Sequence, residues 1–335
     1  MVDEAAWFLG GRVLNCDEPF SPALAARALR ELEAAEEEWR GAGNRDPWLR
    51  LVQIRHAAGP AFFDWCRDVL LRRWPDVDLA WDVEGPPPAE LVGLRGVRAL
   101  RFRVGRFADL GFLAAPAPSL VRLTLCQPSG PRLDLHAVQH LAGLEALALG
   151  GKIAPLAAIA ALPELRQVSL VGGFDKRDLA PLLALPRLES LGLFGGVCDV
   201  ATLARLGRLR ELEISLPRGL SDIGFLRGCD GLERLRLHGI GEVRELPELG
   251  HLAALREVHL HAAKRLTDLS PLAALPALHT LAIGGPSVAE VEDLECFVGH
   301  PTLRVLRVWF AGKARRQRFA EWRRERGLHD GRVSA

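Results

Sequence analysis

One short pattern of apolar residues returns ten times between Val97 and Val308. Each copy holds an apolar residue, two variable residues, a second apolar residue, one variable residue and a third apolar residue. The middle members of the copies are Leu100, Leu123, Leu147, Val168, Leu191, Leu212, Leu235, Val258, Leu281 and Leu306. They lie 21 to 25 residues apart, which is the length of one supersecondary unit rather than the period of a helix or a strand.

The spacing inside each copy predicts a β-strand. Successive side chains of a strand point to opposite faces, so Leu147 and Leu149 share one face while Ala148 lies on the other. A single strand of this kind cannot keep its apolar face away from water, whereas stacked copies can. The chain is therefore predicted to form a solenoid around a parallel sheet. It has about eleven strands when a strand at Leu79, 21 residues before Leu100, is included.

An acidic residue precedes most copies by ten residues, and an apolar residue follows it. This arrangement is typical of a side chain that caps a short turn or helix. The acidic positions are Asp134, Asp178, Asp199, Asp222, Asp268 and Asp293, with Glu245 in the same place and Asp109 one residue earlier. Because each unit is short, the side of the solenoid away from the strands is predicted to consist of 3₁₀ and short α-turns.

These motifs resemble the internalin or SDS22-like class of leucine-rich repeats, whose units end in an Asp-apolar turn followed by Leu-x-x-Leu-x-x-Leu-x-Leu. The resemblance covers about two thirds of the chain. It implies an α/β leucine-rich repeat solenoid with the strands on a concave face. One departure is that the family places Asn three residues after the last apolar strand residue, where this chain has residues such as Gly196, Ile240 and Ala263. The turn that leaves each strand is expected to satisfy its backbone by glycine geometry or water.

The flanks of the repeat predict caps at both ends. The predicted segments are a helical N-terminal cap or small domain over residues 1–75, the solenoid over 76–310, and a basic C-terminal cap helix and tail over 311–335. Helices are expected to begin at Ser21-Pro22, at Asp46-Pro47 and near Pro60. Since a solenoid needs its hydrophobic ends covered, both flanks are interpreted as caps. An independent functional domain at the N-terminus and an acidic or RNA partner for the C-terminal helix remain alternatives.

Composition limits the class of protein. The 335 residues carry a net charge of +1, which argues against a nucleic-acid or membrane surface over the whole chain. Neither a secretory signal nor an 18-residue apolar segment is recognisable. The six cysteines are scattered without a pairing rhythm, so free thiols in a reducing compartment are expected. The sequence thus predicts a cytoplasmic protein, and its richness in Ala, Arg, Gly and Pro indicates a bacterium with a GC-rich genome.

Catalytic and metal-binding motifs were sought and not found. Neither a phosphate-binding loop nor a nucleophile elbow nor a zinc motif occurs. His136 and His140 lie four residues apart, but no further ligand accompanies them at a recognisable spacing. We therefore predict a protein that is not an enzyme and binds neither a cofactor nor a metal. An enzymatic or effector activity of the N-terminal region stays an alternative, with His56, Asp64, Cys66 and Asp68 as its candidate residues.

The variable strand positions predict a binding surface. Equal positions of neighbouring units lie about 4.8 Å apart in a parallel sheet, so they form rows across the strands. The first units are basic, with Arg101, Arg103 and Arg122, and the middle units carry small residues. The predicted partner-binding residues are Phe194, Glu211, Glu213, Arg234, Arg236, His238, Glu257, His259 and His261. The charges among them also fit exposed ion pairs, which contribute only about 0 to 1 kcal/mol each.

The sequence accordingly predicts a protein–protein interaction module that receives a protein partner on the concave face of the solenoid. Resemblance to the SDS22-like class implies an alternative, a regulatory subunit that docks on an enzyme. No membrane contact is expected, and the basic helix over residues 313–326 is the candidate for nucleic acid. A monomer or a component of a hetero-complex is expected.

Overall fold

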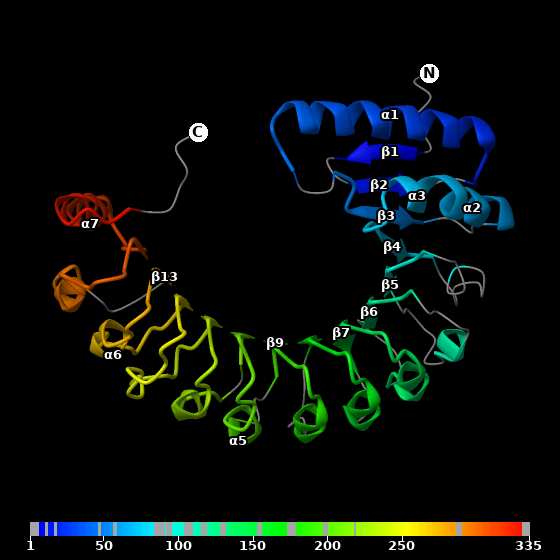
Figure 1. Cartoon of the computed structure of the whole chain (residues 1–335). Helices are drawn as coiled ribbons and strands as arrows, with labels where there is room; N and C mark the ends of the chain where they lie inside the picture. The colour runs from blue at the N-terminus through cyan, green and yellow to red at the C-terminus, as the bar shows by residue number, and fades with distance from the viewer. Residues whose placement is uncertain are drawn as a thin grey trace. The chain divides into compact units, whose positions relative to one another are not determined.

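The computed structural model describes residues 7–10, 13–16, 19–45, 48–55, 59–83, 91, 96–103, 110–114, 119–127, 132–152, 156–172, 179–196, 200–217, 219–285 and 290–329. The chain forms two compact units, Met1–Leu165 and Arg166–Ala335. Each unit repeats one arrangement, in which a strand is followed by a turn and a short helical segment (Figure 1).

The first unit contains seven described strands that pair in chain order. They are β1 (Trp7–Gly10), β2 (Val13–Cys16), β3 (Leu51–Ile54), β4 (Asp78–Trp81), β5 (Ala99–Arg103), β6 (Arg122–Gln127) and β7 (Ala146–Gly151). Strand β1 is antiparallel to β2, and every later pairing in this unit is parallel. Its described helical segments are α1 (Pro22–Gly41), α2 (Pro60–Trp65), η1 (Cys66–Leu70), α3 (Leu71–Arg73), η2 (Gly111–Ala114), η3 (His136–His140) and η4 (Leu156–Ala161).

The N-terminal region is more than the helical cap that the sequence predicts. Helix α1 begins as expected, since the Ser21 hydroxyl accepts a hydrogen bond from the Leu24 amide at 3.2 Å. The predicted helix after Asp46-Pro47, a dipeptide outside the described residues, is wrong. Strand β3 lies there and pairs in parallel with β2 and β4. The repeat therefore begins earlier than predicted, with three strands before β4 in the sequence.

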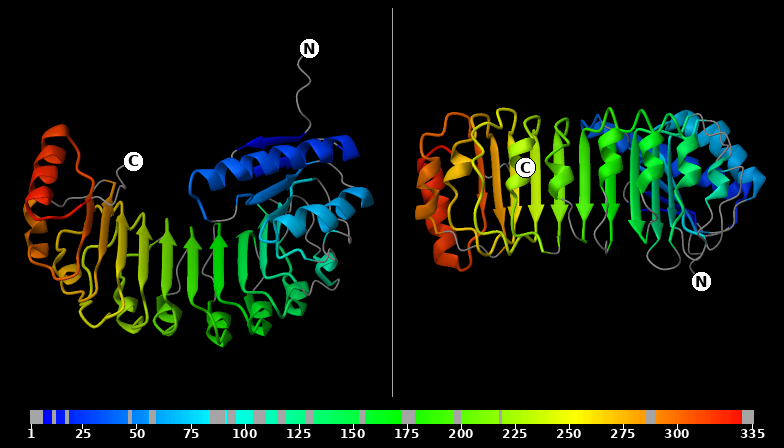
Figure 2. Two further views of the ribbon diagram at one scale, coloured as in Figure 1. Left: turned by 45° about the horizontal axis from the view of Figure 1, so that its top comes forward. Right: turned by 90° about the horizontal axis from the view of Figure 1, so that it is seen from below.

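The second unit contains seven described strands, all parallel and in chain order (Figure 2). They are β8 (Gln167–Val171), β9 (Ser190–Phe194), β10 (Glu211–Ser215), β11 (Arg234–His238), β12 (Glu257–His261), β13 (Thr280–Gly284) and β14 (Val305–Val308). The described helical segments are η5 (Ala180–Ala184), α5 (Val200–Leu203), η6 (Gly224–Gly228), α6 (Ser270–Ala273), η7 (Glu292–Phe297) and α7 (Lys313–Glu325). The short segments between strands confirm the predicted 3₁₀ and short α-turns.

The apolar members of the repeat fill the core of each unit. All of them in the ten copies are buried except Val308, which is partly exposed. A fully buried Leu contributes about 1.5 to 3 kcal/mol relative to an exposed one, so this periodic burial holds the strands in place. The variable strand positions point away from that core, and we call the side of the sheet that they form the strand face.

The turns that leave β7 to β13 depend on a backbone conformation with positive φ. It occurs two residues after the last apolar member of the strand, at Gly151, Gly172, Gly195, Leu216, Gly239, Ala262 and Gly285. The amide of such a residue donates to the next strand's last residue, as from Gly195 to the Ser215 carbonyl at 2.7 Å. Glycine takes this conformation without strain, so the expected glycine geometry is confirmed. Ile240, at the family's Asn position, is buried and continues the core.

Three members of the acidic column make the predicted turn contacts. The carboxylates of Asp134, Asp222 and Asp268 accept hydrogen bonds from the amide two residues further on, at 2.7 to 3.0 Å. These three are Asx-type turns, in which a carboxylate takes the place of a backbone acceptor. Asp293 instead accepts from the earlier amide of Glu290 at 2.7 Å. Asp109, Asp178 and Asp199 lie outside the described residues, and Glu245 is exposed.

Helix α7 covers the end of the second unit, as the sequence predicts. Phe319 and Trp322 are buried, and the Phe319 ring lies 5.3 Å from that of Phe310. The chain after the helix also reaches β14, where the Leu306 amide donates to the His329 carbonyl at 3.0 Å. The outer edge of the last strand is thus partly hydrogen-bonded by the chain itself.

Acidic residues of the last repeat neutralise part of the positive charge of α7. Arg315 pairs with Glu290 at 2.8 Å, and Arg318 pairs with Glu292. A third glutamate, Glu295, accepts from the Trp322 indole at 2.7 Å. The basic helix is therefore engaged within the unit, which weakens the alternative that it binds RNA.

Candidate functional site

The sheet register brings the predicted partner-binding residues together on the strand face of the second unit. Neighbouring strands align them in three rows, Glu211–Arg234–Glu257, Glu213–Arg236–His259 and Ser215–His238–His261. Phe194 lies in register with Ser215. The rows follow from the repeat, since a parallel sheet with one residue period places equal positions side by side.

Ion pairs join the charges of neighbouring strands. Arg234 pairs with Glu211, and the Arg236 guanidinium lies 2.8 Å from the Glu257 carboxylate. The same Glu257 oxygen lies 3.1 Å from Nε2 of His259. Glu257 therefore joins two donors from different strands in a half-buried cluster, where screening by water is weaker than at an exposed pair.

The histidines add aromatic surface to this cluster. Burial lowers the pKa of His259; Glu257 raises it, while Arg236, Arg307 and His238 lower it further. The rings of His238 and His261 stack with their centroids 5.8 Å apart. His261 also lies against the backbone of Gly284, where an added Cβ would approach its ring to 2.9 Å. The group is packed as a surface, and no cluster of three metal-ligating side chains exists among the described residues.

Phe194 packs onto its own strand. Its ring covers Gly192, because a Cβ added there would lie 2.7 Å from the ring and 3.3 Å from the Ser169 hydroxyl. Gly192 thus provides the space that holds the ring flat against the sheet. The ring is partly exposed, so one of its faces stays available to a partner.

Two exposed aliphatic residues continue from Phe194. Val171 is aligned with Phe194 and is 44% exposed, and Leu216, which follows the aligned Ser215, is 72% exposed. Leu216 also adopts a φ of 52°. We call Val171, Phe194 and Leu216 the apolar row. The sequence-based site included Phe194 alone. Val171 lies inside β8 but was not selected, and Leu216 lies one residue beyond β10.

The strand face of the first unit differs from its prediction as a basic surface. The Asp78 carboxylate pairs with both Arg101 and Arg122, at 2.7 and 3.0 Å. A carboxylate shared by two guanidiniums neutralises much of their field. The strand predicted at Leu79 includes Asp78, but the predicted rows of the strand face began one strand later and so left this pairing out.

The three candidate catalytic residues of the N-terminal region that the structure describes, Asp64, Cys66 and Asp68, do not form a site. Asp64 and Asp68 both pair with Arg67, at 2.8 and 2.7 Å. Burial raises the pKa of the Cys66 thiol, which keeps it protonated and weakly reactive. His56 lies outside the described residues. The arrangement supports a structural role for these side chains.

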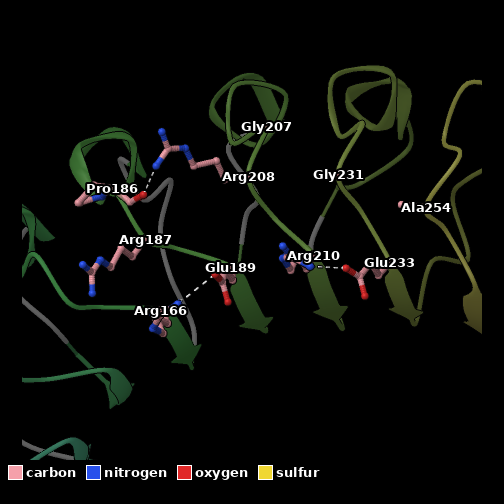
Figure 3. Close-up of a pocket in the computed structure, with 10 residues that line it drawn as sticks. All are labelled: Arg166, Pro186, Arg187, Glu189, Gly207, Arg208, Arg210, Gly231, Glu233 and Ala254. Carbon is pink, nitrogen blue, oxygen red and sulfur yellow. Dashed lines mark hydrogen bonds and ion pairs between the residues drawn. The ribbon is translucent and has the colours of Figure 1, made fainter.

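A second cluster, absent from the sequence-based site, lies where the strands of the second unit begin. A cleft of about 710 Å³ is bounded there by Arg166, Pro186, Arg187, Glu189, Gly207, Arg208, Arg210, Gly231, Glu233 and Ala254 (Figure 3). We call it the edge cleft. The signal was present in the sequence, since the residue after the first apolar member alternates in sign through Arg166, Glu189, Arg210 and Glu233. That position precedes the strand and was left out of the predicted rows.

Within the described parts of the chain, no helix is both long and apolar enough to cross a bilayer.

Comparison with known proteins identifies the fold. No protein-family model and no curated protein matches the chain. An internalin (inlF) from Listeria monocytogenes is 18% identical, with 78% of this chain and 79% of that protein covered and a TM-score of 0.53. Internalin C2 from the same bacterium is 25% identical, covering 54% and 76% with a TM-score of 0.42. A chain of the Drosophila Toll–Spatzle complex is 14% identical, covering 90% and 44% with a TM-score of 0.48. The first likeness confirms the predicted internalin-like leucine-rich repeat solenoid.

Proposed function

We propose that this protein is a non-enzymatic module that binds a protein partner through the strand face of its second unit. The partner contacts the apolar row and the neighbouring charged cluster formed by Arg234, Arg236 and Glu257. Interfaces concentrate their energy in aromatic and arginine anchors surrounded by paired polar groups, and this surface offers both.

Leu216 is the observation that carries the proposal. A residue other than glycine in the left-handed conformation costs about 1 to 2 kcal/mol. Five of the seven residues that adopt positive φ at this place of the repeat are glycines, so the turn itself does not require leucine. An exposed aliphatic side chain at a strained position is explained by a contact that it makes with another molecule.

The strand spacing sets the length of a partner segment that could contact both Phe194 and Arg236. Two strand spacings, about 10 Å, separate Phe194 from Arg236 along the sheet. One extended segment or one helix of a partner spans that distance. Small residues around Phe194, among them Gly192 and Ser169, let the partner approach the ring closely.

The test begins by identifying the partner. Leu216→p-benzoylphenylalanine is irradiated in native lysate, and the cross-linked protein is identified by mass spectrometry. The same photoreactive residue at Val298, which is 50% exposed at the end of η7, is the control for non-specific capture. Equal capture from both positions argues against the proposal. If the captured protein is an enzyme, the regulatory-subunit alternative becomes the specific form of this function.

Calorimetry with the purified partner then measures the contribution of the surface. Phe194→Ala combined with Arg236→Ala is expected to weaken binding by about 2 kcal/mol or more, because both residues are anchors. Val298→Ala is the matched control and is expected to bind like the parent. An affinity of the double variant within about threefold of the parent, less than 1 kcal/mol, places the interface elsewhere.

A further inference from the structure

One glutamate of the strand face has no cation beside it. The first two rows of the second unit hold three glutamates, Glu211, Glu213 and Glu257. Two of them are paired, Glu211 with Arg234 and Glu257 with Arg236. No hydrogen bond or ion pair reaches the Glu213 side chain from any residue that the structure describes. Glu213 is partly exposed, so its carboxylate is accessible to another molecule.

The neighbouring strands do not neutralise this carboxylate. On one side Arg236 is in register with Glu213, but its guanidinium lies 2.8 Å from the Glu257 carboxylate on the next strand. On the other side the aligned residue is Gly192, which has no side chain. A carboxylate that is partly withdrawn from water without a cation is destabilising. The packing of the strands therefore does not explain the charge at Glu213.

An aromatic ring lies beside Glu213. The Phe194 ring covers Gly192, since a Cβ added there would lie 2.7 Å from its Cε2 atom. Because Gly192 is aligned with Glu213, the ring and the carboxylate belong to adjacent strands, about 4.8 Å apart. Among the described residues, no guanidinium or ammonium lies over this ring. Its outer face, which carries the negative charge of the π-system, is thus open to a cation.

A hydroxyl group lies on the opposite side of the ring. Ser169 is aligned with Gly192 on the strand before it, and its Oγ atom would lie 3.3 Å from a Cβ at Gly192. Like Glu213, the Ser169 side chain has no hydrogen bond to a described residue. We call Ser169, Phe194 and Glu213 the acceptor subsite. A hydroxyl and a carboxylate both accept hydrogen bonds and the ring attracts positive charge, so all three groups favour a cationic donor.

We infer that the acceptor subsite receives an arginine side chain of the protein partner. A guanidinium stacks on an aromatic face, and its N–H groups match the two oxygens of a carboxylate. The subsite offers the Phe194 ring to the plane of the guanidinium and Glu213 to its N–H groups. The exposed side chains of Val171 and Leu216 lie on either side and contact apolar residues that flank the arginine.

This inference rests on the proposed function, because it names the chemistry of the partner on the same face. The two can nevertheless fail separately. Capture through Leu216 reports whether a partner contacts the apolar row, whereas removal of one charge at Glu213 reports whether an arginine enters the subsite. A captured partner that binds Glu213→Gln as tightly as the parent leaves the proposed function standing and overturns the inference.

The first experiment needs no identified partner. It uses the full chain and two rhodamine-labelled pentapeptides, Leu-Gly-Arg-Gly-Leu and its counterpart with citrulline in place of arginine. Residues two apart in an extended peptide share a face, so both leucines lie on the side of the central residue. Citrulline keeps the shape of arginine without its charge. Fluorescence anisotropy is expected to show about fivefold tighter binding of the arginine peptide, as for one ion pair at a partly exposed site.

Variants of the subsite then assign this preference to its residues. Glu213→Gln is expected to bind both peptides alike, and Glu213→Lys to weaken binding of the arginine peptide about tenfold by repulsion. Phe194→Leu keeps an apolar side chain without a π-face, and is expected to weaken binding about threefold. Glu248→Gln removes the same charge at an exposed position outside the strand face, and a change of less than about twofold is expected. Thermal unfolding confirms that each variant folds, and the two peptides with the parent protein decide the matter if one does not.

Three results would overturn the inference. The first is that the parent protein binds the arginine peptide no more tightly than the citrulline peptide. The second is an equal effect of Glu213→Gln and Glu248→Gln on binding of the arginine peptide. The third is tighter binding of Leu-Gly-Glu-Gly-Leu than of the arginine peptide, since the strand face would then select an anion through Arg234 and Arg236.

Discussion

The strand face and the edge cleft of the second unit use the same two residue types with different results. On the strand face, Glu211 and Arg234 form a pair, and one oxygen of Glu257 accepts from Arg236 and lies 3.1 Å from Nε2 of His259. At the edge where the strands begin, Arg166 pairs with Glu189 and Arg210 with Glu233. The Arg236–Glu257 pair of the strand face is more buried than the Arg210–Glu233 pair at the edge.

The comparison shows which surface features follow from the repeat alone and which do not. Equal positions of neighbouring units lie about 4.8 Å apart, so alternating signs at one position give ion pairs by default. Such pairs follow from the repeat and say little about binding. The exposed Leu216 is not required by the fold, and it marks the surface that we propose for a partner.

The sharpest test of this comparison removes one glutamate from each surface. Glu257→Ala is expected to lower the free energy of unfolding by about 1 to 2 kcal/mol, because Arg236 and His259 lose a shared, half-buried acceptor. Glu233→Ala removes a more exposed pair and is expected to cost less than about 0.5 kcal/mol. Urea denaturation of both variants gives the two values. Equal losses of unfolding free energy in the two variants would mean that burial does not make the strand-face pair stronger than the pair at the edge.

A substitution in the acidic column provides a reference, because this column lies outside both surfaces. Asp268→Ala is expected to cost about 1 kcal/mol, since the Ser270 amide loses the acceptor that it contacts at 2.9 Å. Asp268→Asn keeps an acceptor oxygen and is expected to retain most of the stability. Denaturation measures the cost, and binding of the partner captured through Leu216 should not change. Reduced partner binding by Asp268→Ala with unchanged stability would assign this column to function.

Replacing the strained residue of the strand face should stabilise the protein. Leu216→Gly is expected to raise the free energy of unfolding by about 0.5 to 1 kcal/mol, because glycine adopts a φ of 52° without steric cost. Ala262→Gly, at a φ of 55°, is the control for the backbone effect alone. Both variants are compared by thermal unfolding. A loss of stability in Leu216→Gly would show that the side chain serves the fold.

The smallest expected effect is on pH dependence. The folded state lowers the pKa of His259 below its ordinary 6.5, so the unfolded chain takes up the proton first. Stability from this group is complete above about pH 6.5 and is lost as the pH falls through the folded-state pKa. His259→Gln should reduce the difference in unfolding free energy between pH 7.5 and 5.5, by less than about 0.5 kcal/mol because the ring is partly exposed. An unchanged difference would contradict this origin.

Most of the fold could be predicted because the repeat has two periods that agree. The 21 to 25 residue spacing identifies the unit, and the alternation within it decides which side chains are buried. Strand β3 was missed although Leu49, Val52 and Ile54 follow the same pattern and are buried. Helix α1, of 20 residues, separates β2 from β3 and breaks the spacing. Strand β3 therefore falls outside the regular 21 to 25 residue spacing from which the other strands were predicted.

The candidate site was harder to predict, because it depends on which polar side chains meet. The rows of the strand face followed from the register. The sharing of Asp78 by two arginines and the edge cleft depend on how long side chains turn beyond the strand. Alternation alone does not determine that. The exposure of Leu216 likewise depends on the turn conformation, which its sequence position did not reveal.

The contact of β14 with the chain after α7 limits how such an array of repeats can be extended. The Leu306 amide and the His329 carbonyl bond to each other, and the Arg323 side chain donates to the Leu306 carbonyl at 3.2 Å. Another copy of the protein cannot add a strand at these groups, which limits fibre formation by stacking of copies end to end. A newly duplicated repeat could not be appended there either. Lengthening by gene duplication is therefore confined to the interior of the array, where each new strand finds a neighbour on both sides.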